Sequence, residues 1–388
     1  MTDVDPDVLV VGGGIGGLSA ALATRRTGAA VRVLEQAYSF GEVGAGLQMA
    51  PNATRILRDW GLLDQVVERG VVPRRLLMRD AVDGSELTHL DLAHTAHRYG
   101  APYVVIHRSD LHEVLVQACR DAGVDLVTGV HVDDVCPEDG GAVAVSSHRR
   151  DTGRIVVAAD GLGSDLRRRL STDEPVSSAY VAYRGAVPLA ELPDVSALAL
   201  DEVVVYIGPH CHLVQYALRG GEIFNQVAVF RSPRALAGEA EWGTPDELDE
   251  AFAGTCDEVR SALPNLWRDR WWRMYDREPI TGWVDERLVL TGDAAHPMLQ
   301  YLAQGACQAI EDAACLGSQV AGGDWDAALA AFEKERAPRT AEVQRRARAW
   351  GDLWHGDGLF RAVRNELLRD RDPHDYRHVD WLYGPVVD

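Results

Sequence analysis

VLVVGGGIGGLSAALATRRTGAAVRVLE, residues 8–35, is the stretch that determines the fold of the first part of this chain. Its pattern predicts a strand over Asp7–Val11, a glycine-rich turn, a helix over Leu18–Thr27 and a second strand over Val31–Leu34. Gly12, Gly14 and Gly17 fit GxGxxG, in which glycines permit a tight turn and the approach of a pyrophosphate. Glu35 follows at the distance expected of an acid that binds a ribose hydroxyl. The stretch predicts a dinucleotide site and leaves FAD and NAD open.

A second informative stretch is LVLTGDAAHPMLQYLAQGACQAIEDA, residues 288–313. It predicts a short strand, an acidic turn at Gly292–Asp293 and a helix that begins at Gly305, with Gly317 as its C-cap. Three small residues of that helix share one face: Ala306, Ala309 and Ala313. We expect this face to approach a flat ligand, and the amides at the helix N-terminus to face electron-rich atoms.

Composition and charge limit the classes of function. The chain has 388 residues, of which 46% are hydrophobic, and a net charge of −20. This length suffices for two domains with separate cores, and the acidic balance argues against nucleic acid and anionic membranes. The N-terminus lacks the positive region of a signal peptide, and the most apolar run, 8–23, is too short to cross a bilayer. We therefore expect a cytoplasmic protein without a transmembrane segment. The six cysteines lack metal-ligand spacing, so we expect reduced thiols and no metal site.

The pattern changes between 176 and 231, where long alternating strands predict an antiparallel meander and hence a second domain. Within the strand over 211–218, His212, Val214 and Tyr216 share one face, and Cys211 and Leu213 share the other. The first face is either a polar-lined wall or the exposed side of an ordinary sheet, and the strand pattern alone favours the exposed side.

The remaining patterns complete a discontinuous organisation. We expect a nucleotide-binding domain from 1–75, 100–175 and 276–340, a substrate domain from 76–99 and 176–275, and a C-terminal helical segment, 341–388. Aromatic residues in that segment suggest docking onto the body or onto a second subunit. The other expected helices cover 51–60, the residues after Arg108 with Ser109 or Asp110 as cap, 244–263 with Thr244 as cap, and 325–348. The other expected strands are a hairpin over 76–91 and strands over 124–135, 142–147 and 155–159. A glycine-rich loop over 42–48 is not expected to be a second nucleotide site.

Three separated motifs occur in one order: the glycine fingerprint with Glu35, Asp160–Gly161 at the end of a buried strand, and Gly292–Asp293. Together they resemble the group A flavin-dependent aromatic hydroxylases. The resemblance implies an α/β fold, with a Rossmann-type FAD-binding domain, an antiparallel-sheet substrate domain and a helical C-terminal tail. It also implies that Arg108, otherwise an ordinary surface arginine, contacts FAD. The implied FAD-binding residues are Gly12, Gly14, Ile15, Gly17, Glu35, Gln48, Arg108, Val130, Asp160, Asp293, Gly305 and Ala306.

Six further segments resemble the 3-hydroxybenzoate 6-hydroxylase branch of that family: 171–185, 206–230, 269–280, 296–306, 350–358 and 380–384. Salicylate 1-hydroxylases look to carry proline where this chain has Gln300, and Met298 replaces a proline of the branch pattern. The resemblance implies para-hydroxylation of 3-hydroxybenzoate to 2,5-dihydroxybenzoate (gentisate), with FAD, NADH and O2, through a flavin C4a-hydroperoxide.

An electrophilic oxidant of this kind needs a phenolate, so a general base should lie near the phenol. His212 suits that role because an unperturbed histidine titrates at about 6.5. Tyr216 and Gln300 are expected to orient the phenol or the carboxylate. The expected partners are a small aromatic acid and O2, with a second copy of the chain as a homodimer. Three alternatives stay open: a salicylate-type or other aromatic-acid hydroxylase, an NAD dehydrogenase without flavin, and a flavin-binding protein without catalysis.

Overall fold

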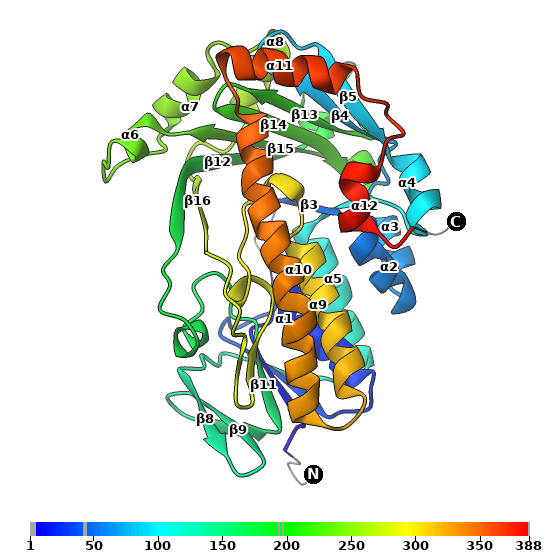
Figure 1. Ribbon diagram of the computed structural model, residues 1–388, viewed down its shortest axis with the longest axis vertical. Helices are drawn as coiled ribbons and strands as arrows, with labels where there is room; N and C mark the ends of the chain where they lie inside the picture. Colours follow the sequence, from blue (N-terminus) through cyan, green and yellow to red (C-terminus); the bar gives the residue numbers. More distant parts are fainter. Residues whose placement is uncertain (1–4, 42–44, 193–194, 196–197, 387–388) are drawn as a thin grey trace. The chain divides into compact units, whose positions relative to one another are not determined.

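The computed structural model describes residues 5–41, 45–192, 195 and 198–386 (Figure 1). It divides into two compact units. The first consists of Met1–Val43, Arg108–Val176 and Asp276–Arg346, and the second of Gly44–His107, Ser177–Tyr275 and Ala347–Asp388. Residues 44–75 and 100–107 therefore belong with the second unit rather than with the nucleotide-binding domain, and so does most of the tail. The first three residues of the expected 42–48 loop lie outside the described residues.

The first unit contains a six-stranded sheet in the order β17-β18-β11-β1-β2-β7. Its strands are β17 (Val284–Asp285), β18 (Leu288–Leu290), β11 (Ile155–Ala158), β1 (Val8–Val11), β2 (Val31–Glu35) and β7 (Asp125–Thr128). All neighbours are parallel except β17 and β18. Every residue of β1, β11 and β18 is buried, as expected for parallel strands that are covered on both faces. The predicted Rossmann-type sheet is confirmed.

Helices of the first unit pack closely against one another. Its main helices are α1 (Ile15–Arg25), α5 (Arg108–Asp121), α9 (Gly305–Val320) and α10 (Trp325–Trp354), whose last residues belong to the second unit. A Cβ on Gly16 would lie 3.4 Å from Cβ of Ala309, and one on Gly317 would lie 3.0 Å from Cβ of Ala23. The small face of α9 therefore packs against α1 (Figure 1). Gly317 is not a C-cap, because it allows this contact within a helix that continues to Val320.

Two further local predictions for the first unit are wrong. The expected strand over 124–135 covers β7 and only the beginning of β8 (Asp134–Glu138), which forms a small sheet with β9 (Gly141–Val145) and β10 (Arg150–Gly153). Helix α5 begins at Arg108, so Ser109 and Asp110 lie in its first turn and neither is the N-cap.

The second unit contains a seven-stranded sheet in the order β16-β12-β15-β14-β13-β4-β5. Its strands are β16 (Trp272–Asp276), β12 (Val176–Pro188), β15 (Ile223–Arg231), β14 (Cys211–Leu218), β13 (Glu202–Gly208), β4 (Arg75–Asp80) and β5 (Glu86–Asp91). The meander from β12 to β15 and the β4–β5 hairpin are antiparallel, as predicted. Within this seven-stranded sheet, β13 and β4 are the only parallel pair among the strands for which pairing is described. A separate ribbon pairs β3 (Gly46–Met49) with β6 (Val104–His107).

One face of this sheet packs on α7 (Pro245–Phe252) and α8 (Asp257–Ala262), where Leu213 and Phe230 share a core with Phe252 and Val259. This contact confirms the predicted parity of β14. Thr244 caps α7 through a capping box with Glu247. The single helix expected over 244–263 is nevertheless interrupted between α7 and α8. The other helices are α2 (Pro51–Asp59), α3 (Leu63–Arg69), α4 (Leu92–Tyr99), α6 (Pro233–Leu236), α11 (Gly358–Arg369) and α12 (Arg377–Tyr383).

The C-terminal tail docks on the second unit itself. Arg361 on α11 donates to both carboxylate oxygens of the buried Asp80, at 2.8 and 2.7 Å, and Asn365 donates at 2.6 Å. Arg98 on α4 forms a bidentate pair with Asp380 on α12, with both distances 2.9 Å. Helix α11 lies against β5 (Figure 1). No helix among the described residues is both long and apolar enough to cross a membrane.

Candidate active site

The turn between β1 and α1 requires glycine at two positions. Gly12 has a φ of +105°, and a Cβ there would lie 2.4 Å from the carbonyl oxygen of Ala159. A Cβ on Gly17 would lie 1.9 Å from the carbonyl oxygen of Gly12. Gly14 is the N-cap residue of α1 and Ile15 is its first residue. The turn thus brings a bare backbone to a helix N-terminus, which is the arrangement that binds a pyrophosphate.

Glu35 lies at the end of β2, beside this turn. Its Oε2 accepts a hydrogen bond from Gly13 N at 2.6 Å, and its Oε1 accepts one from Ala37 N at 2.7 Å. Val130 N donates to the carbonyl oxygen of Glu35 at 2.9 Å, so Val130 flanks the same strand end. The structure therefore brings the predicted ribose-binding acid to the predicted phosphate turn.

Asp160 follows β11, at the carboxyl edge of the same parallel sheet. Its Oδ1 is buried and has no hydrogen-bond partner among the described residues, while Oδ2 accepts a long bond of 3.5 Å from Leu166 N. Burial raises the pKa of Asp160, although hydrogen bonds from Ser164 and the backbone oppose this. A buried carboxylate oxygen without a partner is costly, and a ligand donor at this sheet edge would satisfy it.

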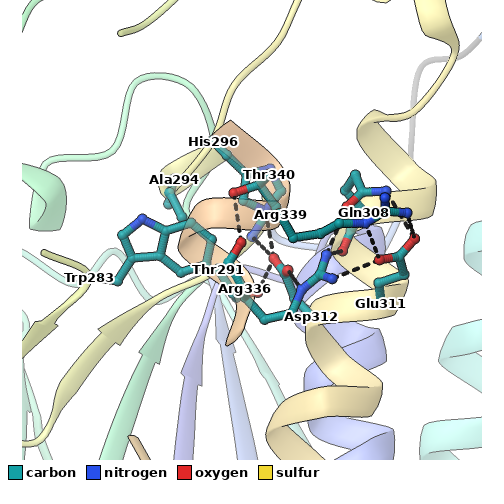
Figure 2. Close-up of polar contacts among 12 residues, drawn as sticks. Trp283, Thr291, Ala294, His296, Gln308, Glu311, Asp312, Arg336, Arg339 and Thr340 are labelled. Atoms are coloured by element: carbon teal, nitrogen blue, oxygen red, sulfur yellow. Dashed lines mark hydrogen bonds and ion pairs between the residues drawn. The ribbon is translucent and has the colours of Figure 1, made fainter. Parts of the chain in front are cut away.

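A buried polar cluster, which was not predicted from the sequence, forms hydrogen bonds to the turn over 291–296 (Figure 2). Oδ2 of Asp312 accepts from Thr291 Oγ1 and Gly292 N, both at 3.1 Å, and lies 2.6 Å from His296 Nε2. Oδ1 accepts from Arg336 Nε at 2.7 Å. Burial alone would raise the pKa of Asp312, but the charges of His296 and Arg336 outweigh burial and lower it. The cluster fixes the turn that carries the exposed Asp293.

Asp293 lies close to the N-terminus of α9. A Cβ on Gly305 would lie 3.9 Å from Asp293 Oδ1, and Gly305 and Ala306 are both only half-buried. Arg108 is the first residue of α5 in the same unit. Gln48 instead belongs to the second unit, where its Oε1 accepts from Tyr103 OH at 2.7 Å. Gln300 lies in a short 3₁₀ turn, Gln300–Leu302, between β18 and α9.

His212 and Tyr216 form a buried wall in the second unit. Only 1% of His212 and 2% of Tyr216 is exposed, so the interpretation as an exposed sheet face is wrong. Burial lowers the pKa of His212 to about 3. Burial also raises the pKa of Tyr216, against the opposing charge of Arg184. A Cβ on Gly46 would lie 2.4 Å from the Tyr216 ring, so this ring requires glycine beside it.

Two further residues of this wall were missed. Asn225, opposite Tyr216 on β15, is fully buried; its Oδ1 accepts from Gly46 N at 3.0 Å, and its Nδ2 has no partner among the described residues. His355, at the end of α10, contacts His212. The alternation of inward and outward side chains along β15 is a sequence signal that could have identified Asn225. The only signal for His355 was its place in the 350–358 segment.

The first unit fits FAD on three observations: a turn that admits no Cβ at Gly12 and Gly17, a buried oxygen of Asp160 without a partner, and an accessible helix N-terminus at Gly305. Glu35, Asp160 and Asp293 would hold the ribose and ribityl hydroxyls, because carboxylates accept from such donors. The amides at Gly14 and Gly305 would face phosphate and flavin oxygens.

Comparisons with known proteins agree with this fit. Residues 5–347 match the model of the FAD binding domain family. The chain is 37% identical to a 3-hydroxybenzoate 6-hydroxylase of Polaromonas naphthalenivorans over 98% of this chain and 96% of that protein, and 39% identical to one of Klebsiella oxytoca over 97% and 96%. A 3-amino-4-hydroxybenzoate 2-monooxygenase of Streptomyces cremeus is 36% identical over 99% and 96%. Among solved structures, Klebsiella pneumoniae HpxO complexed with FAD and uric acid has a TM-score of 0.85, with 28% identity and 97% coverage of both chains. The chain therefore belongs to the FAD binding domain family and, within it, to the FAD-dependent aromatic monooxygenases.

Proposed function

We propose that this enzyme hydroxylates 3-hydroxybenzoate para to its hydroxyl group, with NADH and O2 as co-substrates, and releases 2,5-dihydroxybenzoate (gentisate). The observation that carries the proposal is the buried wall of β14, on which a neutral histidine and a tyrosine lie four residues apart on one face. The names of the Polaromonas and Klebsiella relatives support the choice of substrate.

The choice of base follows from the chemistry of the substrate. Bound FAD supplies the reducing equivalents taken from NADH and the activated oxygen atom that enters the ring. A neutral phenol is a poor partner for an electrophilic oxygen, whereas a phenolate carries negative charge at its ortho and para carbons. His212 is neutral at pH 7 because burial lowers its pKa to about 3. The same burial makes it a weaker base than the unperturbed histidine assumed from the sequence, so a partner that stabilises its charged form is needed. The phenol proton would pass to Nε2 of His212 as the ring is attacked.

Regiochemistry needs a second set of contacts. The Tyr216 hydroxyl and the Gln300 amide would bind the phenol oxygen or the carboxylate and so present the para carbon to the oxidant. Tyr216 keeps its proton at neutral pH, since burial raises its pKa, and it therefore acts as a hydrogen-bond donor. The buried surface around His212 excludes water, which protects a reactive oxygen species from hydrolysis. We further propose that the enzyme is a cytoplasmic homodimer, on the acidic composition and the family resemblance.

Product analysis tests the proposal. The FAD-loaded enzyme is given NADH and 3-hydroxybenzoate, salicylate or 3-methoxybenzoate, and the products are separated by chromatography. We expect gentisate from 3-hydroxybenzoate in proportion to the NADH consumed. 3-Methoxybenzoate has no phenol proton, so it should yield no hydroxylated product. Catechol from salicylate, with no gentisate from 3-hydroxybenzoate, would refute the proposed substrate and retain the hydroxylase.

A further inference from the structure

The buried ring of His212 contacts a second histidine from the C-terminal part of the same unit. His212 Nδ1 lies 2.8 Å from His355 Nε2, with the ring centroids 5.1 Å apart and an interplanar angle of 26°, so the two rings meet edge to edge. Only 4% of His355 is exposed. The His355 ring stacks on Tyr180, with centroids 4.5 Å apart, and Trp354 meets His212 edge-on at 5.1 Å.

The backbone also fixes His355. Its amide donates to the Gly351 carbonyl at 3.1 Å, and its own carbonyl accepts from His210 N at 3.1 Å. The preceding carbonyl, that of Trp354, accepts from Arg364 Nη1 at 2.6 Å. The last turn of α10 is thus joined to the β13–β14 hairpin, and the imidazole of His355 has little freedom to leave His212.

Chemistry allows two arrangements of this contact. When two neutral imidazoles meet nitrogen to nitrogen, one of the two nitrogens carries a proton and donates it, and the other accepts with its lone pair. If His212 Nδ1 carries the proton and donates to His355, Nε2 of His212 has a lone pair and acts as a base. If His355 donates instead, the proton of neutral His212 lies on Nε2, and that nitrogen cannot accept a proton from a phenol.

We propose that His355 is a positioning residue that accepts the hydrogen bond from His212 Nδ1 and so keeps His212 Nε2 as the proton acceptor. This inference rests on the proposed function, because it assigns His212 the role of base. His355 continues to accept the same bond when His212 becomes an imidazolium, and so stabilises the charged form that deprotonation of the phenol creates.

The charges around the pair disfavour a proton on His355. Burial lowers the pKa of His355 well below the usual value, and the neighbouring His212, His210, Arg231 and Arg364 lower it further. Arg231 Nη2 lies 3.1 Å from His210 Nε2. The acids that face this region act on neighbours of the pair. Burial and Arg231 lower the pKa of His210, which the charge of Asp357 only partly opposes, and burial raises the pKa of Tyr180, with a further contribution from Asp352. The surroundings of His355 therefore oppose a second transfer from His212.

The first test is the tautomer of His212 in the FAD-loaded wild-type enzyme, read from nitrogen chemical shifts after labelling of histidine with ¹⁵N. Assignment uses loss of the His212 signals in His212→Asn. We expect a protonated Nδ1 and an unprotonated Nε2. A wild-type His212 protonated on Nε2 would overturn the proposal without reference to turnover or to any His355 variant.

The second test measures the pH at which bound 3-hydroxybenzoate becomes a phenolate, from ultraviolet difference spectra of the oxidised FAD-loaded enzyme. His355→Leu removes the acceptor, and we expect that pH to rise by about one to two units, as for loss of a hydrogen bond to a charged group. His355→Gln places an amide oxygen near the position of Nε2 and should restore most of the shift. The control is His374→Asn, which replaces a histidine whose side chain is 60% exposed and should leave the phenolate pH unchanged.

An unchanged phenolate pH in a folded His355→Leu enzyme would refute the positioning role. Failure of the proposed function has a different signature. The wild-type enzyme would then show the expected His212 tautomer and yet form no gentisate from 3-hydroxybenzoate.

Discussion

Replacing Asp312 by asparagine removes the charge that holds the 291–296 turn. In the wild type, its two oxygens meet four donors, from Thr291, Gly292, His296 and Arg336, within a fully buried site (Figure 2). Asparagine keeps one oxygen and turns an NH2 group toward the remaining donors. Either Arg336 loses the fully buried one of its two carboxylate partners, or the turn loses its acceptor.

The magnitude follows from burial. Breaking a buried charge pair by removing one partner costs about 3–5 kcal/mol. A unit of this size loses roughly 2–4 °C of melting temperature per kcal/mol, so the first unit should melt about 6–20 °C earlier. Mildly acidic pH does not reproduce the loss of stability that the mutation causes. The lowered pKa of Asp312 means that its contribution is present above the unfolded value, near 3.8, and is lost only as pH falls through the lower folded value.

Thermal unfolding of the FAD-free protein and fluorescence titration with FAD measure the two consequences. Loss of the Gly292 tether should also loosen Asp293 and weaken FAD binding about tenfold, which corresponds to about 1.4 kcal/mol. Glu311→Gln is the matched comparison: Glu311 also pairs with Arg336, but its side chain is 13% exposed whereas that of Asp312 is fully buried, so we expect a smaller loss than for Asp312→Asn. An Asp312→Asn protein that melts with the wild type and binds FAD equally well would refute this reasoning.

Three other changes give measurable outcomes. Gly17→Ala places a Cβ 1.9 Å from a carbonyl oxygen, so we expect FAD affinity to fall at least about 100-fold, whereas Gly163→Ala, which meets no atom within 4 Å, should retain the yellow colour. His212 has a depressed folded pKa of about 3, so burial of its neutral form destabilises the fold increasingly as pH falls below about 6.5; urea unfolding should show about 2 kcal/mol lost between pH 6.5 and 4.5 that His212→Phe does not lose. Asp80→Asn leaves Arg361 without its buried partner, which should cost about 3 kcal/mol and speed tryptic cleavage after Arg361; cleavage at the wild-type rate would contradict the docking role of Asp80.

Features that depend on residues close together in the sequence were predictable. The GxGxxG turn needs glycine at Gly12 and Gly17 for contacts within one β–turn–α unit, so local spacing was sufficient. The two-residue period of a strand is likewise enough to place His212 and Tyr216 on one face. That pattern could not decide whether the face was buried, because burial depends on segments elsewhere in the chain.

Features that depend on distant partners were not predictable. Gly317 looked like a helix end because glycine is common there, but its role is set by Ala23 on α1. Asp312 looked like an ordinary helical acid, since Arg336 and His296, which surround it, lie on other segments. His355 lies 143 residues from His212, and nothing in the spacing relates the two. The grouping of 45–75 with the second unit depends likewise on distant contacts, such as the hydrogen bond from Gly46 N to Asn225 Oδ1.

The second unit is assembled from three separate parts of the chain, and its last part is translated last. Asp80 leaves the ribosome long before Arg361, its partner 281 residues later. During synthesis the β4–β5 hairpin must therefore wait with an unpaired acid, while the 108–176 segment of the first unit is made and can begin to fold. Domains generally fold as units during synthesis, but here the segments of the two units alternate along the chain and are therefore synthesised in turn. A ribosome that stops after residue 346 would release all segments of the first unit, but a second unit without His355 and without the tail that covers Asp80.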